Sequence, residues 1–524
     1  MAEQAASYWP KCRRFAAGQS AAQGMDRCRG HREEKMTRAI MLQGTGSDVG
    51  KTLLVAGLCR LARRRGLQVR PFKPQNMSNN AAVAKIPETG GDGEIGRAQW
   101  LQALACGTEP TVHMNPVLLK PQSDTAAQVI VQGKVLAEAQ AADYGSLRQR
   151  LMEAVMDSWA RVGEGADLVV VEGAGSPAEI NLRDRDIANM GFAVAAGVPV
   201  VMVGDIDRGG VIAALAGTHL VLPAEDRAMI RGFIINKFRG DLSLFSGGIS
   251  AIQRFTGWRS FGVVPWLREA ALLPSEDSVI LERLPRGAAA TLKIAVPMLS
   301  RIANFDDLDP LRAEPGVDVV FVPPGQRLPE DASLVILPGS KSTIADLAFL
   351  RANGWELDLI EHRRRGGAIV GLCGGYQMLG RSVADPHGIE GEQRQAEGLG
   401  FLDVETVITP EKTVRNVSAI SAVHQEVLTG YEIHAGETWG PDCARPVAIV
   451  DGRTEGAMSA DGKVFGTYLH GLFSADGFRR RFLAQFGVVA GEASHLNRIE
   501  STLDALACHL ERHLDCDALL AAAR

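Results

Sequence analysis

Two stretches of this sequence carry residue types that could do chemistry. The first, GTGSDVGKT, follows an apolar run and precedes a helical pattern. Its glycines would let phosphate oxygens approach the backbone, and amides at a helix N-terminus favour an anion. Lys51 would reach the β- and γ-phosphates of a nucleotide, and the Thr52 hydroxyl would ligate Mg²⁺. This stretch therefore predicts a site for ATP and Mg²⁺.

The predicted phosphate loop departs by one residue from the commonest pattern. That pattern, G-x-x-x-x-G-K-[ST], would need glycine at position 45, where this chain has threonine. Counted from the preceding glycine, the loop is one residue longer. We expect all of its residues to contact ATP: Gly44, Thr45, Gly46, Ser47, Asp48, Val49, Gly50, Lys51 and Thr52.

Further charged residues could complete the phosphate site. Lys73, in PFKPQ, is suited to neutralising a transferring phosphoryl group and is expected to bind ATP. Glu172 ends the apolar run LVVVE, which is a typical place for a carboxylate that holds Mg²⁺. Asp48 and Glu94 are further candidates for the metal shell. The alternative for each acid is an ordinary solvated or capping carboxylate.

The second stretch, AIVGLCGGYQ, places one cysteine among glycines between an apolar run and a helical pattern. This order predicts a nucleophile elbow, with Cys373 in the place of the usual serine. Small neighbours are needed because the backbone of the nucleophile is strained and the substrate must come close. The amides of Gly374 and of Gly339, in LPGSKS, could form an oxyanion hole.

A nucleophilic cysteine needs a base, and two histidines compete for the role. His470, in GTYLHGLF, stands at the end of a late predicted strand, and His434 stands in GYEIHAG. We favour His470 as the base.

These residues resemble the triad-type (class I) glutamine amidotransferases, which hydrolyse glutamine to release ammonia. The likeness covers about residues 291–485 and implies a flavodoxin-like domain. Many members carry a glutamate two residues after the histidine, whereas this chain has Leu472. We therefore predict a Cys–His dyad.

The elements that must position these residues alternate between strand and helix. Apolar runs at 38–43, 68–75, 167–173, 198–207 and 230–237 form one series, and a second series begins near residue 291. Such alternation predicts an α/β fold of two domains with parallel sheets, whose strand ends gather ligands. We expect a leader at 1–35 that is disordered or reflects an upstream start, domains at 36–285 and 291–485, and a helical tail at 486–524.

Composition excludes several other classes of protein. The 524 residues carry a formal net charge of -5, which argues against nucleic-acid binding. No apolar run reaches the ~18 residues that would span a membrane. None of the eight cysteines forms a C-x-x-C pair, so neither structural zinc nor a disulfide scaffold is expected. This usage fits a cytoplasmic protein.

The phosphate loop, with its acidic residue before V-G-K-T, resembles that of dethiobiotin synthetase and its relatives. Those enzymes use ATP to phosphorylate a carboxylate or carbamate. The resemblance implies a P-loop NTPase-like domain that activates carboxylates. A P-loop switch or partitioning protein is the alternative from another class, but it would usually carry a lysine at the position of Gly46 and would not need Cys373.

From Met36 onward the chain resembles the cobyric acid synthase family. Stretches that carry the likeness include PFKPQNMSNNA, VEGAGSPAEINL, RIANFDDLDPL, GLCGGYQMLG and GTYLHG. The resemblance implies ATP- and glutamine-dependent amidation of carboxylates b, d, e and g of the corrinoid adenosylcobyrinic acid a,c-diamide. The sister enzymes that make the a,c-diamide share both chemistries, and they or another glutamine-dependent carboxylate amidase remain the alternative within enzymes.

The run KPQNMSNNA distinguishes the cobyric acid synthase family from the sister enzymes, because the sister branch lacks it. The resemblance places four polar residues beside Lys73, where they would contact the corrinoid or an acyl phosphate: Asn76, Ser78, Asn79 and Asn80. Their alternative is a polar turn whose hydrogen bonds are satisfied internally.

Overall fold

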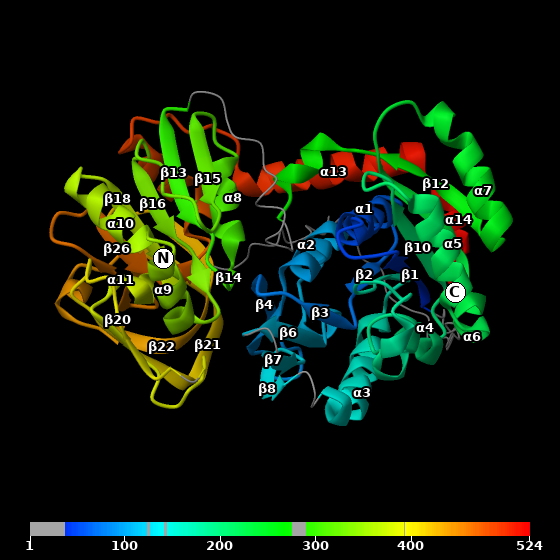
Figure 1. Cartoon of the computed structure of the whole chain (residues 1–524), viewed down its shortest axis with the longest axis horizontal. Helices are drawn as coiled ribbons and strands as arrows, with labels where there is room; N and C mark the ends of the chain where they lie inside the picture. The colour runs from blue at the N-terminus through cyan, green and yellow to red at the C-terminus, as the bar shows by residue number, and fades with distance from the viewer. Residues whose placement is uncertain (1–36, 123–125, 141–143, 275–289, 392) are drawn as a thin grey trace, which may run out of the picture.

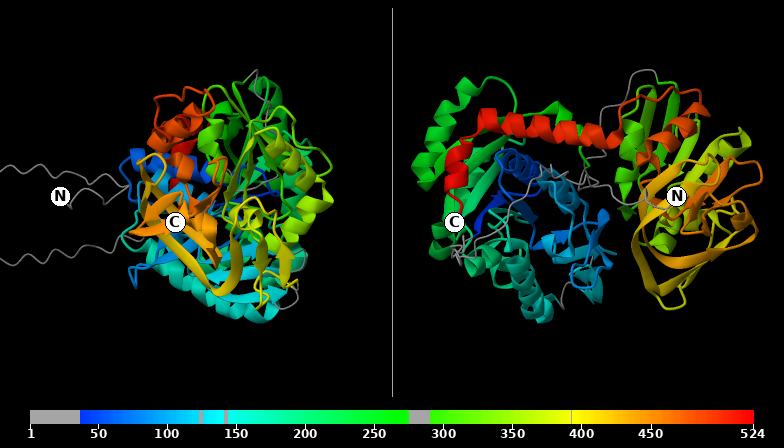
Figure 2. Two further views of the ribbon diagram at one scale, coloured as in Figure 1. Left: turned by 90° about the vertical axis from the view of Figure 1, so that its left-hand side faces the viewer. Right: turned by 180° about the vertical axis from the view of Figure 1, so that it is seen from behind.

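The computed structural model describes residues 37–122, 126–140, 144–274, 290–391 and 393–524. Residues 37–274 form an N-terminal region around one sheet, and residues 290–490 form a C-terminal region around another (Figure 1). The two regions lie side by side, and the long helix α13 (His495–His513) runs from one to the other (Figure 2). The predicted leader at 1–35 lies outside the described residues, as does most of the predicted boundary between the domains.

The N-terminal region is built on a sheet of six parallel strands, as the alternating pattern predicts. In spatial order they are β12 (Arg259–Pro265), β11 (Ile230–Phe238), β10 (Val200–Asp205), β1 (Arg38–Gly44), β9 (Leu168–Glu172) and β2 (Val69–Phe72). Their residues are almost continuously apolar and buried, because helices cover both faces of the sheet.

Seven helices of the described N-terminal region surround this sheet. They are α1 (Lys51–Arg64), α2 (Arg97–Cys106), α3 (Tyr144–Gly163), α4 (Met190–Ala196), α5 (Val211–Val221), α6 (Ala224–Met229) and α7 (Ser246–Thr256). Two apolar cores result, one on each side of the sheet. α1 follows the predicted phosphate loop directly, which puts that loop at the carboxyl end of β1.

Small, mostly antiparallel elements project from this region toward the C-terminal region (Figure 1). One group joins β3 (Gln75–Met77), β6 (Val117–Pro121), β7 (Ala126–Val131) and β8 (Lys134–Gln140); the other is the hairpin β4 (Ala81–Lys85) and β5 (Asp92–Gly96). The strand-and-helix alternation does not predict them. They contact strands of the C-terminal region.

The C-terminal region has a second sheet, parallel except at one edge. Its order is β15 (Val317–Val322), β13 (Leu292–Pro297), β16 (Leu334–Leu337), β18 (Ala368–Leu372), β26 (Val464–Thr467) and the antiparallel β25 (Ala457–Met458). Helices α8 (Asp309–Arg312), α9 (Thr343–Ala352), α10 (Trp355–Arg364), α11 (Gly374–Leu379) and α12 (Asp476–Ala484) accompany it.

A separate, mostly antiparallel sheet of the C-terminal region faces the N-terminal region. It contains β20 (Gln395–Glu397), β19 (Ser382–Ala384), β21 (Glu405–Ser421), β22 (Val427–Trp439), β27 (Leu469–His470), β23 (Ala448–Val450) and β24 (Arg453–Glu455). A two-stranded pair, β14 (Ile302–Ala303) with β17 (Gly339–Ser340), lies nearby. An apolar cluster joins Ala81 and Val83 of the hairpin to Tyr431 and Ile433 of β22.

The end of the chain returns to the N-terminal region. Helices α13 and α14 (Cys516–Ala521) add Leu503, Leu506 and Leu510 to the core beneath α1. Arg524 exchanges two backbone hydrogen bonds with Ala39 of β1. The segment predicted as a helical tail is therefore part of the N-terminal core. No helix among the described residues combines the length and apolar character needed to cross a membrane.

Candidate active site

Two glycines of the phosphate loop, Gly44 and Gly50, stand where a side chain would be strained or would clash. A Cβ at Gly44 would lie 2.6 Å from Val49 Cγ2 and 2.8 Å from the Gly46 carbonyl oxygen. Gly50 has φ +90°, which favours glycine. By contrast, a Cβ at Gly46 would meet no atom within 4 Å. The loop is thus packed at its base and open at Gly46, as a phosphate cradle requires.

The remaining loop residues are held by the neighbouring strands. The Thr45 amide donates to Val203 O at 2.9 Å, and Val49 O accepts from Asn236 Nδ2 at 2.8 Å. Ser47 is exposed at the tip of the loop. Asp48 pairs with Arg208, its Oδ2 lying 2.9 Å from Nη2.

Lys51 joins the loop to the segment that follows β9. Its Nζ donates to Gly46 O at 3.0 Å and to Gly175 O at 3.2 Å. The ammonium group is buried and points across the cradle toward backbone oxygens. This placement fits the phosphate-binding role predicted for it.

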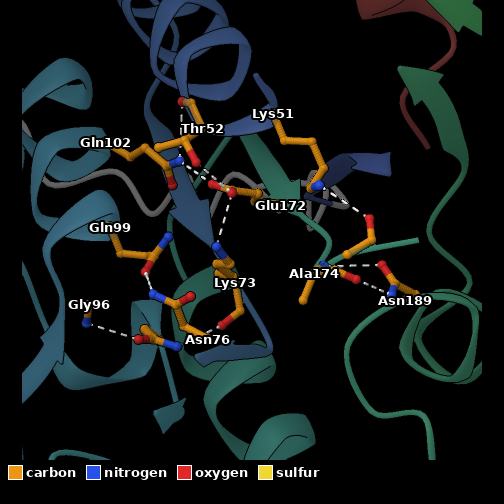
Figure 3. A network of polar contacts seen from close by, with 12 residues as sticks. Lys51, Thr52, Lys73, Asn76, Gly96, Gln99, Gln102, Glu172, Ala174 and Asn189 are labelled. Carbon is orange, nitrogen blue, oxygen red and sulfur yellow. Dashed lines mark hydrogen bonds and ion pairs between the residues drawn. The ribbon is translucent and has the colours of Figure 1, made fainter. Parts of the chain in front are cut away.

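Glu172, at the carboxyl end of β9, is the centre of a polar network (Figure 3). Its Oε1 accepts from Thr52 Oγ1 at 2.8 Å and from Lys73 Nζ at 3.0 Å, while its Oε2 accepts from Gln102 Nε2 at 2.5 Å. The carboxylate is almost fully buried, so these donors offset its desolvation. The structure therefore brings together three residues that the sequence predicted separately, and adds Gln102, which the pattern gave no reason to single out.

The oxygens of Thr52 and Glu172 fit Mg²⁺, which prefers hydroxyl, carboxylate and phosphate oxygens. Within the described ranges no cluster of three His, Cys, Asp or Glu side chains could hold a metal by itself. Magnesium often binds in this way, through one or two protein ligands together with substrate phosphates and water.

Glu94 lies in a different set of contacts. It is buried on β5, where its carboxylate pairs at 2.5 Å with both Lys120 Nζ and Lys412 Nζ. Burial opposes the charged form, but the two lysines lower the pKa of Glu94 to about 2. These contacts give no support to Glu94 as a metal ligand, because two ammonium groups already neutralise it.

The polar run after Lys73 is partly satisfied by its surroundings. Asn76 Nδ2 donates to Gln99 Oε1 at 3.1 Å, and the Asn80 amide donates to Ser78 Oγ at 3.0 Å. The buried Oδ1 of Asn79 has no hydrogen-bond partner among the described residues. A buried acceptor without a partner is costly, so Asn79 is a candidate to bind a ligand.

Cys373 occupies the sharp turn between β18 and α11. Its φ of 51° is unusual for a non-glycine residue, and such strain is common at reactive positions. A Cβ at Gly374 would lie 2.8 Å from Ser340 N, so glycine is needed for the close approach of the turn to β17. The local geometry is that of a nucleophile elbow.

A cavity of about 160 Å³ opens beside the cysteine. Residues from both regions line it, among them Lys120, Gly339, Cys373, Glu390, Lys412, His434 and His470. The Cys373 thiol lies 3.5 Å from Ile433 O on the cavity wall. The amide of Gly374 belongs to the first turn of α11, where N–H groups have no intrahelical acceptor.

His470 is held by a carboxylate that the sequence did not single out. Its Nδ1 lies 2.7 Å from Asp307 Oδ2, and Asp307 Oδ1 accepts from the Gly471 amide at 2.7 Å. Burial alone would lower the pKa of His470, but Asp307 raises it to about 10, with a further contribution from Cys373. The buried Nε2 has no geometrically defined hydrogen-bond partner in the described part of the chain.

The predicted Cys–His dyad did not include this carboxylate, which stands where the third member of a triad would act. Leu472 indeed leaves the usual position of the third residue without a carboxylate, but Asp307 reaches the same nitrogen from the short 3₁₀ turn Phe305–Leu308. The signal was present in the stretch RIANFDDLDPL, whose acidic residues had no assigned role.

The competing histidine, His434, has a different environment. Its Nδ1 faces Gly436 O at 3.1 Å, and its ring stacks on Tyr468 with centroids 3.9 Å apart. Burial lowers the pKa of His434 to about 4. His434 lines the cavity as a neutral ring, whereas His470 is the histidine oriented by a carboxylate.

Comparison with known proteins places these two centres in one family. Residues 40–280 match the family model described as the CobQ/CobB/MinD/ParA nucleotide binding domain, and residues 293–478 match the CobB/CobQ-like glutamine amidotransferase domain. A cobyric acid synthase of Mesorhizobium japonicum is 70% identical over 93% of this chain and 100% of its own length. The chain belongs to the cobyric acid synthase family.

Other members of this family are almost as similar. A cobyric acid synthase of Brucella suis is 65% identical, again over 93% of this chain and the whole of its own length. A solved structure titled "Crystal structure of glutamine amidotransferase" covers 37% of this chain and 99% of its own, with 16% identity and a TM-score of 0.28. The family assignment rests on the full-length relatives and the two family models.

Proposed function

We propose that this chain is a glutamine-hydrolysing ligase that uses ATP to convert peripheral carboxylates of a corrinoid into amides. The observation that carries the proposal is the pairing, in one chain, of an elbow cysteine with a carboxylate-held histidine and of a lysine cradle with a buried Glu172 network. Relatives at 65–70% identity named cobyric acid synthase support the substrate class.

In the first half-reaction, Cys373 attacks the side-chain amide carbon of glutamine. The imidazolium of His470, stabilised by Asp307, favours the attacking thiolate and then donates its proton to the departing ammonia. The amides of Gly374 and Gly339 stabilise the oxyanion. Water next cleaves the thioester, which releases glutamate and returns the proton to His470. The Cys373, His470 and Asp307 side chains thus act as a triad.

In the second half-reaction, the phosphate loop holds ATP while a substrate carboxylate attacks its γ-phosphorus. Lys51 and Lys73 stabilise the charge that develops on the phosphoryl oxygens. Thr52 and Glu172 would hold Mg²⁺, which supplies further neutralisation of phosphate charge when it is bound. Ammonia then displaces phosphate from the acyl phosphate. The sum is carboxylate, ATP, glutamine and water giving amide, ADP, phosphate and glutamate.

The finer identity of the substrate follows from the family and from the polar run. We propose adenosylcobyrinic acid a,c-diamide, amidated at b, d, e and g to give adenosylcobyric acid. Asn79 is the first residue that we assign to this substrate, with Asn76, Ser78 and Asn80 shaping the run around it. Neither a nucleic acid nor a membrane takes part, and we expect the enzyme in the cytoplasm.

A direct assay separates this proposal from its alternative. The enzyme is given ATP, Mg²⁺ and glutamine with either cobyrinic acid or its a,c-diamide, and the products are weighed by mass spectrometry. We expect four amidations of the a,c-diamide and none of cobyrinic acid at positions a and c. Conversion of cobyrinic acid to its a,c-diamide would instead assign the sister activity.

A further inference from the structure

A buried ion pair crosses the interface next to the glutaminase triad. Arg97, the first residue of α2, belongs to the N-terminal region, and its Nε lies 2.8 Å from Oδ2 of Asp306. The two side chains are only 11% and 3% exposed. The guanidinium also lies 4.1 Å from the centre of the Trp100 ring. Asp306 directly precedes Asp307, the carboxylate that holds His470.

The 3₁₀ turn that carries these acids is fastened to the N-terminal region a second time. Asn304, which precedes the turn, donates from Nδ2 to Ala81 O of β4 at 3.0 Å and to the Tyr431 hydroxyl at 2.9 Å. The Tyr431 ring stacks on His470 with centroids 5.1 Å apart. The position of Asp307 therefore depends in part on contacts with the N-terminal region.

The same helix touches the nucleotide centre along its length. Five residues after Arg97, Gln102 donates from Nε2 to Glu172 Oε2 at 2.5 Å and to Thr52 O at 3.4 Å. Between them, Gln99 holds Asn76 of the polar run. A helix of this length moves as one body, so a change at Glu172 that displaces Gln102 also moves Arg97.

Charge explains why Arg97 matters for the triad. Asp306 and Asp307 are adjacent buried carboxylates, and each disfavours the charge of the other. Burial raises the pKa of Asp306, and Arg97 opposes that rise. By neutralising Asp306, Arg97 leaves the negative charge of Asp307 available to orient and charge His470. Without this arginine, the turn would have to move or to take up a proton.

We propose that Arg97 is a positioning residue for glutamine hydrolysis and that α2 couples the nucleotide centre to the Cys373–His470–Asp307 triad. Substrate binding around Glu172 and Thr52 changes the contacts of Gln102, and α2 transmits this change to Asp306. Glutamine would then be hydrolysed fastest when a carboxylate is ready to receive ammonia. This inference rests on the proposed function of both centres.

The test compares nitrogen sources in the full-length Arg97→Ala enzyme. We expect ammonia-dependent amidation to stay at the native rate. Stimulation of glutaminase by ATP plus the corrinoid acid should fall by about fivefold or more, the lower range of allosteric coupling. The loss should appear in kcat for glutamine with KM unchanged, because Arg97 orients the triad and does not contact glutamine.

Three further variants make the result specific. Arg97→Lys keeps the charge and should restore part of the coupling, while Asp306→Asn removes the same pair from the other side and should lose it. Arg60→Ala is the matched control: Arg60 is also largely buried in the same region, but pairs with Glu500 and Asp504 of α13. It should lower thermal stability and leave the ratio of glutamine to ammonia use unchanged.

The outcomes separate the inference from the proposed function. If Cys373→Ala still uses glutamine, the assignment of the triad fails. If Cys373→Ala loses glutamine use but Arg97→Ala and Asp306→Asn keep native stimulation, the coupling alone is overturned. Should Arg97→Ala not fold, Arg97→Lys and Asp306→Asn carry the test, and native coupling in both would reject the proposal.

Discussion

The two reactive centres lie at the carboxyl ends of parallel strands, yet their key groups differ in how fully the protein satisfies them. Glu172, at the end of β9, accepts hydrogen bonds from three side chains. His470, in β27, has one nitrogen held by Asp307, while its other nitrogen is buried without a geometrically defined partner in the part of the chain that the structure describes. The nucleotide centre is a network whose hydrogen bonds are satisfied internally, whereas the glutaminase centre has a histidine that lines a cavity.

This difference follows from the chemistry of each centre. A phosphate site is completed by its ligand. Before ATP binds, its carboxylate and lysines can therefore stabilise one another, and when ATP binds the lysines can pair with its phosphates instead. A nucleophilic site must be preorganised, because proton transfer needs the base in place before the substrate arrives. The contrast implies that loss of the cysteine removes one activity cleanly, whereas loss of a cradle residue disturbs a network.

The largest effect should come from Cys373→Ala. Removing the nucleophile should lower glutamine-dependent amidation by roughly 10³-fold or more while ammonia-dependent amidation continues. Both rates can be measured from ADP formation with each nitrogen source. Cys443→Ala, at another half-buried cysteine of the same region, is the control and should keep both rates. Loss of both activities in Cys373→Ala would show that the centres are not separable.

Lys51→Ala should affect both nitrogen sources, because it acts on phosphoryl transfer. We expect amidation to fall by about 10²- to 10³-fold with glutamine and with ammonia alike, the usual cost of one transition-state donor. Basal glutaminase, measured without ATP, should persist. The control is Lys463→Ala, because Lys463 is exposed and its Nζ donates to Gly366 O, outside the phosphate site. Normal amidation in Lys51→Ala would reject the phosphate assignment.

Asp307→Asn tests the third member of the triad through pH. Asp307 raises the pKa of His470 to about 10, so the imidazolium persists to high pH in the native enzyme. Without the carboxylate, burial lowers that pKa and the imidazolium is lost at a lower pH. Glutaminase should fall by roughly 100-fold, and its alkaline limb should move toward neutral pH.

The same substitution makes a signed prediction for stability. A raised pKa in the folded state stabilises the protein below the unfolded histidine value of about 6.5, and this contribution disappears as pH rises toward 10. The stability difference between the native enzyme and Asp307→Asn should therefore be largest in acid and shrink in alkali. Chemical unfolding at several pH values measures it. If the alkaline limb of the glutaminase profile is unchanged and the stability difference does not vary with pH, Asp307 is not a member of the catalytic site and Cys373 and His470 act as a dyad.

The parts of the fold that the sequence predicted are those with a strong local signal. Buried parallel strands are continuous apolar runs, and β1, β9, β10 and β11 each stand out in this way. The phosphate loop and the cysteine elbow are likewise contiguous, so their chemistry can be inferred from spacing alone. Lys73 and Glu172 could be placed because each directly follows or ends such a run.

What the sequence did not reveal is carried by contacts between distant segments. Three acids stand close together in NFDDLDP, namely Asp306, Asp307 and Asp309, and only the tertiary fold selects the one that meets His470. The lysine partners of Glu94 lie 26 and 318 residues away in the sequence, so the local pattern does not reveal them. The long hairpin β21–β22 has alternating, half-exposed positions, which give a weaker signal than a buried run.

The smallest effects are expected from substitutions of two glycines in the phosphate loop, and comparing them tests the nucleotide centre most finely. Gly46→Ala places a methyl group in open space, so the free energy of unfolding should change by less than about 1 kcal/mol. Gly44→Ala meets Val49, the Gly46 carbonyl and Lys51 Nζ within 2.9 Å and should destabilise by about 1–3 kcal/mol.

The KM for ATP should not follow the free energy of unfolding in these two variants. If the open space at Gly46 receives phosphate, the methyl group of Gly46→Ala should raise KM for ATP although the fold is intact. Basal glutaminase should stay native in Gly46→Ala, because the elbow at Cys373 is not touched. Thermal unfolding and ATP titration of both variants provide the measurement. A native KM for ATP in Gly46→Ala would mean that phosphate does not lie against this glycine. The phosphate site would then have to be assigned to the loop around Gly44 and Gly50 instead.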